Sequence, residues 1–128
     1  RIVRAIEKLE LQHVVITSVT RDDLPDGGAY HFKSVVEQVK KVFPQVTVEV
    51  LIPDFQGRFE AVCLVAEAMP DILNHNIETV RRLFPAIRPE GNFDRSVTLL
   101  RRVKQNFAGM LVKSGLMVGL GEEHTEVE

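Results

Sequence analysis

The sequence alternates between short β-rich runs and helical patterns, and this alternation constrains the fold more than any other feature. The first run, His13–Val19, is almost continuous in apolar and β-branched residues, which predicts a strand covered on both faces. Three further runs follow, at Val46–Ile52, Asp71–Asn76 and Met110–Val118. Regular alternation with short connections predicts parallel strands joined by right-handed crossovers. An α/β fold therefore follows, and both a doubly wound sheet and a (β/α) barrel satisfy the pattern.

Apolar residues at helical spacing predict the helices between these strands. The chain opens inside such a pattern at Ile2–Leu9, and a second pattern closes at Pro44. A third covers about Arg58–Ala68, and a fourth covers Asp94–Asn106, with Asp94 as the predicted N-cap. The apolar stripe of this last helix is predicted to be Val97, Leu100 and Val103.

Composition limits the class of protein. A chain of 128 residues suffices for one domain, and 45% hydrophobic with 27% charged residues is typical of a globular protein. The formal net charge of −2 gives no electrostatic reason to expect nucleic acid, and no apolar run is long enough to span a membrane. The single cysteine, Cys63, excludes an internal disulfide and any all-cysteine metal site within one chain. Because helical patterns meet both ends, we expect residues 1–128 to be a single segment truncated at both ends.

Polar residues follow each predicted strand at its carboxyl end, where ligands bind in both candidate architectures. Three successive large polar side chains, Asn74 to Asn76, need partners at the end of a buried strand. Strand alternation places Asn74 and Asn76 on one side and directs His75 to the helices, as a structural histidine. Lys113 lies among apolar residues, which predicts a carboxylate or cofactor partner for its ammonium group.

Four segments are similar to characteristic stretches of the lipoyl synthase family. Ile16–Ala29 resembles VITSVDRDDLxDGGA, with Thr20 where that family has aspartate. Val48–Gly57 resembles VEVLIPDFxG, Asn74–Val80 resembles NHNxETV, and Lys113–Glu122 resembles KSGLMVGLGE. The match is collinear over the whole chain. The last segment alone also resembles a glycine-rich motif of radical S-adenosylmethionine enzymes in general.

This resemblance implies a parallel (β/α) partial TIM-type barrel segment with about four βα units. It implies an enzyme that inserts two sulfur atoms at the sixth and eighth carbons of an octanoyl group, through a 5′-deoxyadenosyl radical. The implied partner is an octanoylated lipoyl-carrier domain or protein, with no nucleic acid and no membrane, in the cytoplasm or in the mitochondrial matrix of a eukaryote. The implied cofactors are S-adenosylmethionine and two 4Fe-4S clusters. We expect the cluster cysteines outside residues 1–128, so no catalytic residue or metal ligand is assigned here and the segment alone should be inactive.

The resemblance and the strand positions together predict a cofactor site. Its predicted members are Thr17, Ser18, Asp26, Gly27, Gly28, Asn74, Asn76, Glu78, Lys113, Gly115 and Gly119. The backbone at Gly115 and Gly119 can approach a flat adenine, because no Cβ intrudes. The loop at Asp26–Gly28 is expected to meet the methionyl amino group, and Asn74–Glu78 offers hydrogen bonds to ribose hydroxyls.

Two alternatives stay open at the level of the sequence. One is another sulfur-inserting radical enzyme such as a biotin synthase, which the joint presence of the Thr17–Gly28 and Asn74–Val80 segments disfavours. The other is a non-catalytic α/β module that binds a nucleotide or a protein partner.

Overall fold

The computed structural model describes residues 1–128 and shows strands that alternate with helices along the chain. The strands are β1 (His13–Thr17), β2 (Thr47–Leu51), β3 (Ile72–Asn74) and β4 (Leu111–Lys113). The helices are α1 (Ile2–Lys8), α2 (Ala29–Val42), α3 (Phe59–Ala66), α4 (Phe84–Ile87), α5 (Phe93–Asn106) and α6 (His124–Val127), and the 3-10 turn η1 (Phe55–Gly57) follows β2. The predicted alternation is therefore confirmed.

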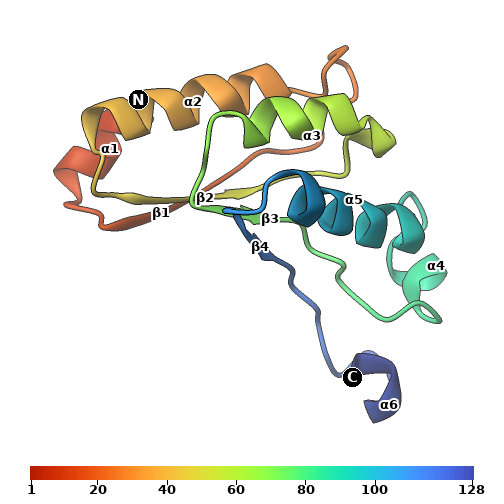
Figure 1. The fold of residues 1–128 in the computed structure, drawn as a ribbon. Coiled ribbons are helices and arrows are strands. Elements are labelled where there is room, and N and C mark those ends of the chain that lie inside the picture. The colour runs from red at the N-terminus through yellow and green to blue at the C-terminus, as the bar shows by residue number, and fades with distance from the viewer.

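All neighbouring strands are parallel, and the sheet has the order β1-β2-β3-β4. Helix α1 packs on α2, α2 on α3 and α3 on α5, so these helices form one layer on a single side of the sheet (Figure 1). A doubly wound sheet reverses its strand order and carries helices on both faces. The uninterrupted strand order and the single helical layer instead match a segment of a (β/α) barrel.

The outer face of the sheet, which we define as the face toward the helices, carries the hydrophobic core. Val48, Val50 and Leu73 are fully buried there. The strand register aligns Ile16 with Val50 and Val50 with Leu73, so one apolar row crosses β1, β2 and β3. Helices α2 and α3 cover this row with Phe32, Val36, Val39, Val62 and Val65. Burial of this layer is the main source of stability in the fold.

The inner face of the sheet, on the opposite side, carries no helix. Val15 is 54% exposed and Leu111 is 62% exposed on this face. The prediction that the first strand is covered on both faces is therefore wrong for this chain, because the helical layer lies on one side only. The buried residues of the inner face are polar, and they are Glu49 and Asn74. The two faces thus differ in chemistry as well as in exposure.

Strands β3 and β4 are shorter than the runs that predicted them. Strand β3 ends at Asn74 and β4 ends at Lys113. Pairing nevertheless resumes beyond both ends, because Glu78 and Leu116 form an isolated parallel bridge. The polar stretch after Asn74 therefore remains alongside the glycine-rich stretch after Lys113.

Helix α5 begins earlier than predicted. Asn92 has an extended backbone, and its side-chain oxygen accepts a hydrogen bond of 2.9 Å from the Arg95 amide, so Asn92 is the N-cap. Asp94 lies in the first turn of the helix instead, where its carboxylate is paired with the Arg81 guanidinium at 2.6 Å. The buried stripe is accordingly Ser96, Leu99 and Val103.

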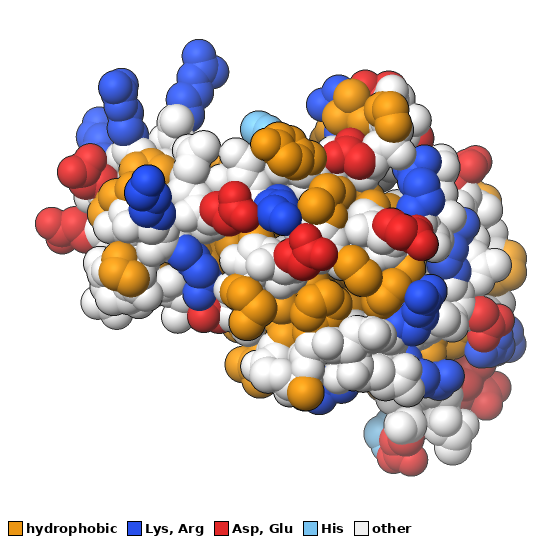
Figure 2. All heavy atoms as spheres, turned by 45° about the horizontal axis from the view of Figure 1, so that its top comes forward, with side chains coloured by type: hydrophobic (Ala, Val, Ile, Leu, Met, Phe, Trp, Pro, Cys, Tyr) orange, Lys and Arg blue, Asp and Glu red, His pale blue; other side chains and the backbone are white.

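Beyond β4 the chain leaves the sheet and ends in α6, at the bottom of Figure 1. Over the helical layer, charged side chains of both signs are mixed with apolar ones (Figure 2). None of the helices combines the length and the apolar character needed to cross a membrane.

Candidate functional site

The carboxyl ends of β1, β2 and β3 surround an open hollow of about 140 Å³, here called the rim hollow. Its polar lining comes from three separate parts of the chain: Thr17, Ser18 and Thr20 at the end of β1 and just beyond it, His75, Asn76 and Glu78 after β3, and Arg88 after α4. Four predicted site residues, Thr17, Ser18, Asn76 and Glu78, are thereby brought together. Arg88 was not predicted, because a single arginine after a short helix carries no pattern that separates it from a solvated surface residue.

The stretch after β3 is held in place by the stretch after β4. The Glu78 amide donates to the Gly115 carbonyl at 3.0 Å, and the Glu78 carbonyl accepts from the Met117 amide at 2.8 Å. Glu78 has a positive φ of 73°, which is rare for a residue with a side chain and is concentrated at functional positions. A Cβ added to Gly115 would lie 2.6 Å from Asn76 Oδ1, so glycine is required there for the Asn76 side chain to pass.

Asn74 lies on the inner face, as predicted, but its amide nitrogen is already engaged. Asn74 Nδ2 donates to Glu49 Oε1 at 2.9 Å, and Lys113 Nζ lies 3.0 and 3.2 Å from the two oxygens of the same carboxylate. The carboxylate partner expected for Lys113 is thus Glu49, which sequence reasoning missed. The signal for it was one acidic residue within the apolar run of β2, but its partner lies 64 positions away in the chain.

Glu49 is 2% exposed and is the buried acidic residue of the inner face. Burial alone raises the pKa of a carboxyl group, but hydrogen bonds from Lys113 and Asn74, with the nearby charges of Lys113 and His13, outweigh it and lower the pKa of Glu49. His13 Nε2 lies 3.5 Å from Glu49 Oε2. Glu49 is therefore ionised at neutral pH and acts only as a hydrogen-bond acceptor.

His75 points to the helical layer, as strand alternation predicts. Its Nδ1 lies 2.9 Å from the Ile52 carbonyl oxygen, and its Nε2 lies 2.8 Å from Ser96 Oγ on α5. A carbonyl can only accept, so Nδ1 carries the proton and Nε2 accepts from the serine hydroxyl. Burial lowers the pKa of His75, which keeps the ring neutral. His75 joins the sheet to α5 and is a structural residue.

The loop after β1 uses its predicted site residues to begin α2. The Asp26 carboxylate accepts from the Gly28 amide at 3.0 Å and from the Tyr30 amide at 2.8 Å, and these two bonds lower the pKa of Asp26. Gly27 has a φ of 63°, and a Cβ there would come within 2.7 Å of the Phe55 ring. Gly28 lines a second hollow of about 260 Å³, which also contains Thr17 and Ser18.

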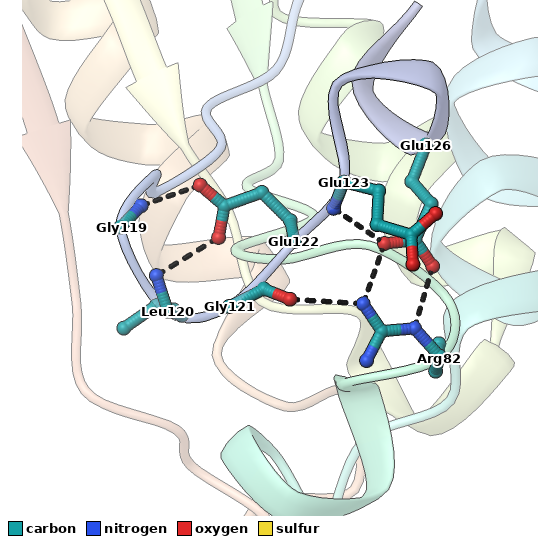
Figure 3. A network of polar contacts seen from close by, with 7 residues as sticks. All are labelled: Arg82, Gly119, Leu120, Gly121, Glu122, Glu123 and Glu126. Carbon is teal, nitrogen blue, oxygen red and sulfur yellow. Dashed lines mark hydrogen bonds and ion pairs between the residues drawn. The ribbon is translucent and has the colours of Figure 1, made fainter.

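The glycine-rich turn after β4 is stabilised by a polar network (Figure 3). The Glu122 carboxylate accepts from the amides of Gly119 and Leu120. Arg82 binds the Glu126 carboxylate through two nitrogens, at 2.9 and 2.8 Å, and the Gly121 carbonyl at 2.9 Å. Gly119 has a φ of 93°, and a Cβ at this position would meet nothing within 4 Å, so its glycine is required by the backbone rather than by crowding.

Cys63 lies half-buried on α3, and burial raises the pKa of its thiol. A protonated thiol is a poor metal ligand. No group of three or more His, Cys, Asp or Glu side chains is placed to hold a metal ion.

Known proteins resemble this chain closely in sequence. A lipoyl synthase of Caldanaerobacter subterraneus subsp. tengcongensis is 55% identical over 127 residues, which cover 99% of this chain and 44% of that protein. A lipoyl synthase of Oleidesulfovibrio alaskensis is also 55% identical over 127 residues, covering 99% of this chain and 43% of that protein. The chain therefore spans less than half the length of these curated relatives.

A solved structure resembles the chain in fold. The crystal structure of methylornithine synthase (PylB) superposes with a TM-score of 0.69 at 18% identity, covering 98% of this chain and 37% of that one. At this identity the likeness concerns the fold alone. The family model of the radical SAM superfamily matches residues 1–128. The chain belongs to the radical S-adenosylmethionine superfamily.

Proposed function

We propose that this chain is part of a lipoyl synthase and that the rim hollow holds S-adenosylmethionine. The observation that carries the proposal is the convergence of Asn76, Glu78 and Arg88 at the carboxyl edge of a parallel sheet. This edge is where (β/α) barrels bind their ligands. The chain is also 51–55% identical to lipoyl synthases over nearly its whole length.

The residues at the rim fit the polar parts of this cofactor. The Glu78 carboxylate and the Asn76 amide can satisfy the two ribose hydroxyls, each of which both donates and accepts. The Arg88 guanidinium offers a positive charge to the methionyl carboxylate. The hydroxyls of Thr17 and Ser18 lie across the same hollow and can bind the methionyl amino group.

Two glycine positions are proposed to serve the cofactor differently. Gly115 lets Asn76 cross the backbone closely, so that its amide stands at the hollow. Gly119 carries a left-handed backbone that turns the chain away from the sheet, and Glu122 holds the turn. The stretch between them presents backbone amides and carbonyls beside the rim, which suits the edge of an adenine ring.

When bound and reduced, S-adenosylmethionine supplies the 5′-deoxyadenosyl radical that removes hydrogen from an alkyl substrate. The task of this chain is to bind and orient the partners of that step. The proposed substrate is an octanoyl group on a lipoyl-carrier domain or protein. The exposed apolar side chains of the inner face, Val15 and Leu111, offer a surface that an alkyl chain can contact. Such a contact removes apolar surface of both the chain and the protein from water, which is favourable.

The two 4Fe-4S clusters that we propose for the complete enzyme do not fit the residues present here. Their ligands are cysteine thiolates, and the chain has one cysteine. We therefore place the cluster ligands outside residues 1–128, and we derive no step of the reaction through them.

The test uses the full-length protein that contains this segment, reconstituted with iron and sulfide without oxygen. It is incubated with S-adenosylmethionine, a one-electron reductant and an octanoylated carrier domain. We expect 5′-deoxyadenosine, together with a carrier whose mass shows two sulfur atoms in place of two hydrogens. Formation of 5′-deoxyadenosine without sulfur insertion would contradict the proposed reaction.

A further inference from the structure

Glu49 is a charged side chain that the fold buries at some cost, and its surroundings show what it does. It lies in the middle of β2 on the inner face and is 2% exposed. Its carboxylate is shared by three groups from three other strands: His13 of β1, Asn74 of β3 and Lys113 of β4. A buried carboxylate needs such partners, because an isolated one would be strongly unfavourable.

The hydrogen bond to Glu49 fixes which way the Asn74 amide faces. Glu49 is ionised and can only accept, so the amide must present its NH₂ group to Glu49 Oε1 at 2.9 Å. The reversed amide would place two oxygens at that distance. Asn74 Oδ1 is consequently turned away from Glu49, where it is buried and has no hydrogen-bond partner, and Asn74 as a whole is 6% exposed.

An unpartnered oxygen in a buried side chain indicates a missing donor. The strands on either side do not supply one, because the neighbouring residues in register are Leu51 and Lys113, and the ammonium group of Lys113 is directed to Glu49. Asn74 is the last residue of β3 and does not itself line the rim hollow, but its strand neighbour Leu51 and Asn76, two residues further along the chain, both do. The unpartnered oxygen therefore lies beneath the floor of the hollow, where a ligand donor that inserts between Leu51 and Asn76 would reach it.

We propose that Glu49 is a positioning residue, which holds Asn74 Oδ1 as a fixed acceptor for a hydroxyl or amide N–H donor of the bound ligand. The inference rests on the proposed function, which offers two such donors: a ribose hydroxyl of the cofactor and the amide N–H that joins the octanoyl group to its lysine. Lys113 and His13 keep Glu49 ionised, and ionised Glu49 keeps the amide from turning over.

The test compares variants of the full-length protein, at matched iron content, by titration with S-adenosylmethionine and with an octanoyl-lysine peptide. Glu49→Gln removes the constraint on the Asn74 amide. The glutamine side chain can either donate or accept a hydrogen bond, so the Asn74 amide can bind it in either orientation. We expect the dissociation constant for one of the two ligands to rise about 5- to 150-fold, and that ligand identifies the donor. Glu37→Gln, on the exposed side of α2, removes the same charge as a matched control and should change neither constant.

Asn74→Ala provides an independent test, because it removes the acceptor Oδ1 and leaves the Glu49–Lys113 ion pair intact. It should weaken binding of the same ligand as Glu49→Gln, and the double variant should bind no worse than Asn74→Ala alone. A purely electrostatic role makes a different prediction, since Glu49→Gln combined with Lys113→Gln would then restore binding.

Three results would overturn the inference: unchanged constants in both Glu49→Gln and Asn74→Ala, restoration by Lys113→Gln, or additive losses in the double variant. Should Glu49→Gln fail to fold, normal binding of both ligands by Asn74→Ala overturns it alone. A wild-type protein that binds neither ligand contradicts the proposed function and the inference together, which separates that failure from the others.

Discussion

The two faces of the sheet are built for different purposes. On the outer face, Val48, Val50 and Leu73 are fully buried under α2 and α3. On the inner face, the buried groups are polar and the apolar groups, Val15 and Leu111, are exposed. The same short strands carry both patterns, because alternate side chains point to opposite faces. Stability therefore resides on one face, and the other is free to hold a ligand.

The two faces should differ most in how much stability a leucine-to-alanine substitution costs. In the full-length protein, Leu73→Ala removes a fully buried side chain and should lower the free energy of unfolding by about 2–5 kcal/mol. Leu111→Ala removes a side chain that is 62% exposed and should cost much less. Denaturant unfolding of both variants measures the difference. An equal or larger cost at Leu111 would make the inner face a packed core and remove the contrast.

The second effect concerns the histidine that joins the sheet to α5. His75→Ala abandons the Ile52 carbonyl and the Ser96 hydroxyl, and each unsatisfied partner costs about 1–3 kcal/mol. The melting temperature should therefore fall, while affinity for S-adenosylmethionine should change little. A variant that melts normally but loses the cofactor would place His75 in the binding site instead.

Much of the outer face could be predicted from the sequence, because its signal is local. Continuous apolar runs and stripes at helical spacing located β1, β2, β3, α2, α3 and α5 to within about two residues, whereas the run that predicted β4 extends five residues beyond its end. The alternation also assigned His75 to the helices correctly. The N-cap of α5 was predicted wrongly, because Asn92 and Asp94 are both good caps two residues apart and the local sequence does not separate them.

The third effect separates two glycines that the sequence treats alike. Gly119→Ala forces a side chain to adopt a φ of 93° and should cost about 1–2 kcal/mol of stability. Gly115→Ala should cost less stability, because the clash at 2.6 Å falls on the end of the Asn76 side chain, which can move. Its effect should appear instead as weaker cofactor binding. Thermal unfolding and cofactor titration of both variants test this, and identical profiles would contradict the separation.

The smallest effect is expected at the start of α2. Asp26→Ala leaves the Gly28 and Tyr30 amides without their acceptor and should cost about 0.5–2 kcal/mol. Since the pKa of Asp26 is lowered in the folded state, its contribution is present above the unfolded pKa of about 3.9 and is lost as the pH falls below it. Thermal unfolding of the wild type and the variant should therefore converge at low pH. A difference that stays constant as the pH falls well below about 3.9 would contradict the capping role.

The inner face was harder to predict, because its partners are distant in sequence. Strand alternation placed Asn74 on this face and predicted a partner for Lys113, but Glu49 is a single acidic residue between two valines. Its role depends on a register that brings β2, β3 and β4 side by side. Arg88 was not predicted as a site residue for the same reason, since only the folded loop after β3 brings it to the rim hollow.

Whether the rim hollow holds S-adenosylmethionine is decided by the affinity of the cofactor for variants of the full-length protein at matched iron content. Asn76→Ala and Glu78→Ala each remove one proposed hydrogen bond to the cofactor, worth about 1–3 kcal/mol, and His75→Ala serves as the control, because His75 borders the same hollow but both of its ring nitrogens are bound to Ile52 and Ser96. We expect dissociation constants to rise about 5- to 150-fold for the Asn76 and Glu78 variants, with little change for the His75 variant. Normal binding by Asn76→Ala and Glu78→Ala, with loss only in His75→Ala, would contradict the assignment of this site.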